Sequence, residues 1–181
     1  RGSRSHGEVL LLFPRSRVHE GDVAPVAAFR ERGKEMLDQH VLFDVLPDDL
    51  ATPSIRATYR AVVDVTQAPT KMANDLSRFQ APTTVRISVD RTAAKNALVV
   101  HCVNYAREDG APGRGKGGAD ERPAVVKEIA VDLLLPQGAR AGKIVFLRPE
   151  ELDAKVELVA TTQNGRLQFR IPEFLAYAVV R

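Results

Sequence analysis

The hydrophobic period of this sequence changes once along the chain, and that change limits the folds it can adopt. Short continuous apolar runs occupy residues 8–13, 41–46 and 61–65, and a helical period of three to four residues covers 24–39. Continuous apolar runs are typical of parallel strands that are covered on both faces. From residue 83 onward apolar and polar residues alternate, which predicts half-buried antiparallel strands. We therefore expect an α/β segment followed by an all-β segment.

The α/β segment, residues 7–68, reads as strand, helix, strand, short helix and strand. This order is the beginning of an open parallel sheet. Asp22 is a candidate N-cap for the first helix, and Thr52 and Pro53 could open the short one. Residues 15–22 are expected to be a loop. No further βα unit follows Val65, so we expect an incomplete, three-stranded parallel βαβ(α)β unit.

The all-β segment, residues 83–181, predicts an antiparallel β-sandwich of about seven strands. Asn164 and Gly165 give the strongest hairpin signal, because both residues tolerate a positive φ. Residues 69–82 are expected to be a linker. The Gly-rich residues 107–122 interrupt the sandwich and predict a long, mobile surface loop.

Composition excludes some classes of function. The chain has 26 Lys and Arg against 23 Asp and Glu, a formal net charge of +3, which is too small by itself to indicate nucleic-acid binding. Its single cysteine, Cys102, lies in an apolar run and is expected to be a buried thiol rather than a nucleophile. No apolar run approaches the ~20 residues that span a bilayer. Residues 1–6 resemble a tag or a cut end, with no signal peptide behind them.

Familiar catalytic and metal-binding motifs are missing from the sequence. None of the four histidines has the spacing of metal ligands, so neither a metal nor another cofactor is expected. Residues 110–116 match the spacing of a phosphate-binding loop up to Lys116, but Gly117 stands where a Ser or Thr belongs. No helix pattern follows to supply backbone donors. We therefore do not expect nucleotide binding.

Candidate ligand-binding residues follow the first two predicted strands. Arg15 and Arg17 come after the first strand, and Asp48 and Asp49 come after the second. The carboxyl ends of strands in an open parallel sheet are where ligands bind, and two arginines could hold an anionic group. Glycosidase chemistry needs two facing carboxylates, which neighbours in one loop rarely provide. The alternatives are helix capping by the aspartates and salt bridging between domains or subunits by the arginines.

Several stretches of both segments support a more specific comparison. In the α/β segment these are EVLLLFPRSR (8–17), EMLDQH (35–40), VLFDVLPDD (41–49) and YRAVV (59–63). In the β segment they are VVHCVNY (99–105), IAVDLLLPQGA (129–139), VFLRP (145–149) and LQFRIPEFLAYAVV (167–180). Together they resemble the C-terminal accessory region of β-galactosidases of glycoside hydrolase family 42 and relatives. That region consists of an amidotransferase-like, flavodoxin-like trimerisation domain, shortened here, and a small C-terminal β domain.

The resemblance implies a role in carbohydrate metabolism, with the α/β domain serving assembly beside an active site. The barrel that carries both catalytic glutamates of such enzymes has no counterpart here, so no catalytic residue is implied. We expect a non-catalytic accessory or assembly fragment of a bacterial, cytoplasmic glycoside hydrolase-like protein. The alternatives are a carbohydrate-binding β-sandwich and a small hydrolase with its site at the parallel strand ends. Expected partners are further copies of the chain, as a dimer or trimer, and carbohydrate, but neither nucleic acid nor membrane.

Overall fold

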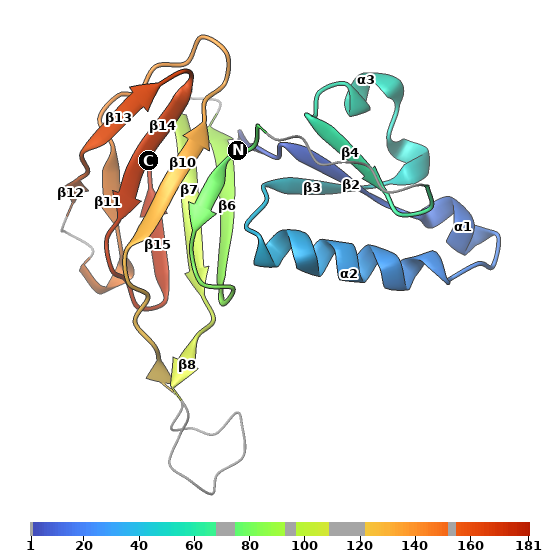
Figure 1. Ribbon diagram of the computed structural model, residues 1–181, viewed down its shortest axis with the longest axis horizontal. Coiled ribbons are helices and arrows are strands. Elements are labelled where there is room, and N and C mark those ends of the chain that lie inside the picture. Colours follow the sequence, from blue (N-terminus) through green and yellow to red (C-terminus); the bar gives the residue numbers. More distant parts are fainter. Residues whose placement is uncertain (1, 68–74, 93–96, 109–121, 152–154) are drawn as a thin grey trace, which may run out of the picture.

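The computed structural model describes residues 2–67, 75–92, 97–108, 122–151 and 155–181. Figure 1 shows an α/β half that lies beside a β-sandwich, with the N-terminus at the junction of the two. The predicted fold class, an incomplete parallel α/β unit together with an antiparallel β-sandwich, is confirmed. None of the described helices is long and apolar enough to cross a membrane.

A three-stranded parallel sheet forms the centre of the α/β half. Strand β2 (Val9–Phe13) lies between β3 (Phe43–Pro47) and β4 (Ala61–Asp64). Helix α2 (Pro25–Asp38) covers one face of this sheet, and α3 (Pro53–Arg56) lies over the other. The central strand is buried on both faces, as its continuous apolar run predicts.

The two faces of β2 pack into separate clusters. Leu11 packs with Met36 of α2 on one face, and Leu10 packs with Ala51 and Tyr59 on the other. Alternation of side chains along the strand gives each cluster every second residue. The sheet is therefore covered on both sides, although no further βα unit follows β4.

The helix boundaries differ in part from the sequence predictions. Residues 15–19 form the short helix α1 (Arg15–His19), where a loop was expected. The N-cap of α2 is Ala24, not Asp22, whose carboxylate accepts a hydrogen bond from the Ala24 N–H at 3.1 Å. Thr52 does cap α3, because its Oγ1 accepts from the Ile55 N–H at 3.3 Å. A 3-10 turn, η1 (Asp48–Leu50), links β3 to this helix.

Two antiparallel sheets form the sandwich. The larger has the strand order β1-β6-β7-β15-β11-β12, and the smaller has the order β13-β14-β10-β5. Their bounds, in chain order, are β1 (Ser3–Ser5), β5 (Arg78–Gln80), β6 (Val85–Thr92), β7 (Ala97–Asn104), β10 (Ile129–Leu134), β11 (Val145–Leu147), β12 (Val156–Glu157), β13 (Ala160–Gln163), β14 (Arg166–Ile171) and β15 (Tyr177–Val180).

The sandwich core lies between the two sheets. Phe146, Phe174 and Ile129 are among its largest fully buried side chains. Cys102 is also fully buried, and burial raises the pKa of its thiol to about 12. This confirms that Cys102 is a buried thiol. Such a thiol is protonated at neutral pH and is a poor nucleophile.

Two strands of the sandwich lie outside the range 83–181 expected for it. Strand β1 falls within residues 1–6, which the sequence pattern set aside, and pairs antiparallel with β6. Strand β5 falls within the expected linker and pairs with β10. Both are three-residue strands, too short for a clear period.

Turns of the sandwich follow the local sequence where the signal is strong. Asn164 and Gly165 both have positive φ, 52° and 72°, and connect β13 to β14 as the hairpin pattern predicts. The Gly-rich segment begins and ends in a two-stranded ribbon, β8 (Arg107–Glu108) and β9 (Arg122–Pro123). The mobile loop was predicted at 107–122; its ends form these two strands, and its residues 109–121 lie outside the described residues. A second 3-10 turn, η2 (Pro149–Glu151), follows β11.

Buried polar contacts join the two halves. Glu8 is only 5% exposed, and its carboxylate accepts hydrogen bonds from the Ser77 N–H at 2.8 Å and the Ser77 hydroxyl at 2.5 Å. The same hydroxyl oxygen accepts from the Leu134 N–H of β10 at 2.8 Å. Leu42, which precedes β3, packs into the sandwich core. The α/β half is thus tied to the sandwich by hydrogen bonds and by apolar packing.

Candidate functional site

Two of the predicted site residues pair with each other at the carboxyl ends of the parallel strands. Arg15 opens α1 directly after β2, and Asp49 lies in η1 directly after β3. Since β2 and β3 are neighbours, these residues meet. The Arg15 Nε lies 2.9 Å from Asp49 Oδ1, and its Nη2 lies 2.5 Å from Oδ2. This bidentate pair occupies both oxygens of the carboxylate.

Asp48 and Arg17 are engaged in separate contacts. Asp48 Oδ1 accepts hydrogen bonds from the Ser16 N–H at 3.0 Å and the Ser16 hydroxyl at 3.1 Å. Arg17 pairs with Asp22 at 2.7 Å, in the turn that leads to α2. The structure therefore brings Arg15, Asp48 and Asp49 together but directs Arg17 to a different carboxylate.

The electrostatics of this cluster favour permanently charged groups. The hydrogen bond from Arg15 lowers the pKa of Asp49, and the hydrogen bond from Arg17 lowers the pKa of Asp22. A general acid in a glycosidase needs the opposite shift, a carboxyl whose pKa is raised so that it keeps its proton. The cluster can tie α1 to η1, but these contacts leave little of its charge free for a ligand.

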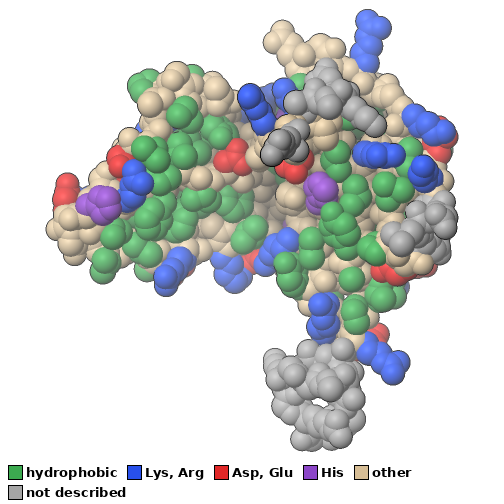
Figure 2. Space-filling model, turned by 180° about the vertical axis from the view of Figure 1, so that it is seen from behind, with side chains coloured by type: hydrophobic (Ala, Val, Ile, Leu, Met, Phe, Trp, Pro, Cys, Tyr) green, Lys and Arg blue, Asp and Glu red, His purple; other side chains and the backbone are tan. Residues whose placement is uncertain are grey.

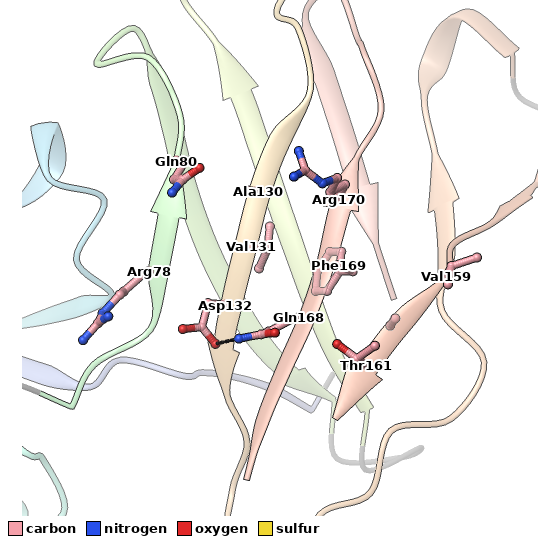
Figure 3. Close-up of a pocket in the computed structure, with 11 residues that line it drawn as sticks. Arg78, Gln80, Ala130, Val131, Asp132, Val159, Thr161, Gln168, Phe169 and Arg170 are labelled. Carbon is pink, nitrogen blue, oxygen red and sulfur yellow. Dashed lines mark hydrogen bonds between the residues drawn. The ribbon is translucent and has the colours of Figure 1, made fainter. Parts of the chain in front are cut away.

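A second candidate site is a depression of about 720 Å³ on the outer face of the four-stranded sheet. Figure 3 shows the side chains that line it. Because side chains alternate along strands, the outward positions of adjacent strands supply a polar surface, whereas Val131 and Phe169 beneath it belong to the core. The outward residues are Arg78, Gln80, Ala130, Asp132, Thr161, Gln168 and Arg170.

The groups in this depression are suited to hydrogen bonding. Asp132 holds Arg166 at 2.9 Å through the guanidinium Nε and lies 3.5 Å from the Gln168 amide nitrogen. Arg170 pairs with Glu128. Phe169 is the aromatic residue in the lining, and it is buried. A sugar here would be held by amide and guanidinium groups, without an exposed aromatic ring to stack on.

Sequence reasoning did not find this surface. Each strand contributes an ordinary inward apolar and outward polar pattern, which predicts only a solvated face. The hollow depends on which strands become neighbours: β5 precedes β10 by about fifty residues, and β13 and β14 follow it. Among the described residues, no group of three or more His, Cys, Asp or Glu side chains could hold a metal ion.

Comparisons with known proteins find similarity of fold only over part of the chain. No family model and no curated protein matches the sequence. One similar solved structure is α-L-fucosidase isoenzyme 2 from Paenibacillus thiaminolyticus, with 16% identity, a TM-score of 0.44, and coverage of 58% of this chain and 14% of that one. Another is a cycloisomaltooligosaccharide glucanotransferase of Paenibacillus sp. complexed with cycloisomaltoheptaose, with 17% identity, a TM-score of 0.45, and coverage of 61% and 17%.

The chain thus spans less than a fifth of either structure. Similarity at this level carries no information on what the chain binds or does. The resemblance to glycoside hydrolase family 42, which rests on residue patterns, remains a prediction.

Proposed function

We propose that this chain is a non-catalytic accessory region of a carbohydrate-processing enzyme. The observation that carries the proposal is the bidentate contact of Arg15 with Asp49, together with the contacts of Asp48 to Ser16. The residues that would form a strand-end site hold α1 against η1. They support the fold of the α/β half.

Glycosidase chemistry places strict demands on two carboxyl groups. They must face each other across the scissile bond, about 5 to 10 Å apart, and one must stay protonated. Asp48 and Asp49 are neighbours in one turn, and the pKa of Asp49 is lowered. This arrangement favours a structural role over a hydrolytic one.

The test is an assay of the purified chain against a panel of aryl glycosides. We expect no turnover above buffer for the wild type, Asp48→Asn or Asp49→Asn. Asp22→Asn is the matched control, because it removes an equally exposed ion-paired carboxylate outside the strand-end turn. Turnover by the wild type that Asp48→Asn or Asp49→Asn abolishes, and Asp22→Asn retains, would show a hydrolase instead.

An assembly role for the α/β half has separate support. Strands β3 and β4 each have one edge unpaired within the described residues. Unpaired strand edges and exposed apolar side chains favour association with another chain. Figure 2 shows apolar side chains gathered over this half. Five of the nine large hydrophobic residues found exposed in the described chain lie in it: Val23, Leu37, Val45, Leu50 and Ile55. A second copy of the chain is the partner that we propose.

A second candidate function is sugar binding by the depression on the four-stranded sheet, favoured by its row of outward amide and guanidinium groups. Titration calorimetry with soluble neutral oligosaccharides tests it. Gln168→Ala should weaken binding by about tenfold, while Gln163→Ala, an exposed change at the end of β13, should not. Equal affinity in both variants would exclude this surface.

A further inference from the structure

A polar pocket of about 480 Å³ lies where the two halves meet. The α/β half contributes Asp44 of β3 and residues 58–60, which lead into β4. The sandwich contributes residues 4–6 in and after β1, Arg91 of β6, and residues 134–137 at and after the end of β10. Its volume falls within the range of small-molecule sites, and it is separate from both sites described above.

Three guanidinium groups line this pocket, and among the described residues one of them, that of Arg60, has a carboxylate partner. The Arg4 backbone pairs with that of Arg91 across β1 and β6, but its guanidinium has no hydrogen-bond or ion-pair partner among the residues that the structure describes. The Arg91 guanidinium contacts the His6 ring, at 3.4 Å. Arg60 forms an ion pair with Asp75 at 3.6 Å, and it shares that carboxylate with Arg166, which lies at 2.6 Å. Arginines of this kind have donors free for an external anion.

The two carboxylates at the pocket are already satisfied within the protein. Glu8 accepts both hydrogen bonds from Ser77. Asp44 accepts from the Tyr59 hydroxyl at 2.8 Å, and it is packed against Gly7, where a Cβ would lie only 2.6 Å from the carboxyl group. Among the described residues neither carboxylate forms an ion pair with Arg4, Arg60 or Arg91, so the guanidinium donors of Arg4 and Arg91 are not taken up by Glu8 or Asp44.

His6 positions one of these cations. Its Nε2 lies 3.4 Å from the Leu134 carbonyl and its Nδ1 lies 3.4 Å from Arg91 Nη2. In the tautomer that donates from Nε2 to the carbonyl, Nδ1 accepts from the guanidinium. Burial lowers the pKa of His6, and the charge of Arg91 acts in the same direction. A neutral imidazole thus orients Arg91, and the other N–H groups of the Arg91 guanidinium stay available to a ligand.

Hydroxyl and amide groups complete the lining. Ser5, Thr58, Tyr59 and Gln137, which carry hydroxyl or amide groups, line the same pocket as the guanidinium groups. This combination matches a small molecule with several hydroxyls and one anionic group, since a guanidinium binds carboxylate or phosphate in bidentate fashion. We propose that the pocket between the halves binds a monosaccharide that carries an oxyanion.

Titration calorimetry on the whole chain tests this site, at neutral pH and constant ionic strength. The probes are glucuronate, glucose phosphate and unmodified glucose. We expect both anionic sugars, or one of them, to bind, and glucose to bind at least about tenfold more weakly. The stronger of the two anionic probes identifies the oxyanion as carboxylate or phosphate.

Arg4→Gln and Arg91→Gln should each weaken binding of the anionic sugar by about tenfold or more. Both residues are exposed, so their loss should leave the fold intact, which a thermal melt of each variant checks. Arg122→Gln, at an exposed position of β9, is the matched control and should bind as the wild type does. The proposal is overturned if neither anionic sugar binds, if glucose binds equally well, or if Arg122→Gln weakens binding as much as the pocket variants.

Discussion

At the residue scale, Ser77 has an importance that its position in the predicted linker does not suggest. Its hydroxyl donates to the buried Glu8 carboxylate and accepts from the Leu134 N–H, so one side chain serves both halves. Replacing Ser77 by Ala leaves a buried charge and a buried N–H each short of a partner. Such groups are costly to leave unpaired.

We therefore expect Ser77→Ala to lower the free energy of unfolding by about 2 to 4 kcal/mol. Ser54→Ala, which removes an exposed hydroxyl from α3, should stay within about 0.5 kcal/mol of the wild type. Urea denaturation of the three proteins measures the difference. Equal stability of Ser77→Ala and Ser54→Ala would mean that the Glu8 carboxylate does not depend on Ser77.

His6 gives a pH dependence with a definite sign. Burial lowers its pKa in the folded state below the value of 6.5 that applies to the unfolded chain, Arg91 and Arg60 add to this effect, and the Leu134 carbonyl and Glu8 oppose it. Between the folded and the unfolded pKa, the unfolded chain binds more protons than the folded one. The contribution of neutral His6 to stability is therefore present above pH 6.5 and is lost as the pH falls toward the lowered pKa. The lowered pKa values of Asp22, Asp38 and Asp49 act in a separate window, below 3.8.

The measurement compares the wild type with His6→Gln by denaturation from neutral to mildly acidic pH. The wild type should lose stability more steeply below pH 6.5, because glutamine does not titrate. Parallel curves for the two proteins would contradict the lowered pKa of His6.

At the element scale, the sequence predicts elements where a strong local signal and a long period coincide. Helix α2, the buried strand β2 and the Asn164-Gly165 hairpin are all confirmed. Short elements depend on tertiary partners: β1 exists because β6 offers an edge, and β5 because β10 does. The pairing of Arg15 with Asp49 follows from the adjacency of β2 and β3, whereas the sequence pattern predicted ligand binding, helix capping or salt bridges between domains for these residues. Both pockets arise from neighbours that are distant in sequence, which no local pattern contains.

The base of the Gly-rich segment is fixed by one buried side chain. Asn104 is 1% exposed; its amide N–H groups donate to the Ala124 and Leu175 carbonyls at 2.6 Å, and its carbonyl oxygen accepts from the Ala106 N–H at 2.8 Å. Asn104→Ala should therefore cost about 2 to 3 kcal/mol.

Replacing residues 109–121 by a two-residue Asn-Gly turn should change stability by less than about 1 kcal/mol, because closing a loop costs only slightly more as the loop lengthens. Thermal unfolding of Asn104→Ala and of the loop replacement compares their losses of stability. A loop deletion that costs more than Asn104→Ala would mean that this segment is packed or bound to a ligand.

At the scale of the whole molecule, the exposed apolar residues and open strand edges of the α/β half lead us to expect self-association. Light scattering over a wide concentration range should show a dimer or trimer. Val45→Lys, which places a charge on the half-exposed edge strand β3, should shift the chain toward monomer. Val159→Lys is the matched control, since Val159 is 91% exposed on the sandwich. A wild type that is monomeric at every concentration would exclude assembly through this half.

The proposed accessory role of the chain depends on the α/β half and the sandwich folding as one unit. Leu76 completes the cluster beneath α2, Leu42 packs into the sandwich core, and the Glu8 carboxylate is satisfied only by Ser77 among the described residues. Residues 7–66 expressed alone lack Leu76 and Ser77. Calorimetry should therefore give one cooperative transition for the whole chain and none for residues 7–66. A cooperative transition for the isolated 7–66 segment, or two separate transitions in the whole chain, would contradict the view that the two halves form a single supporting body.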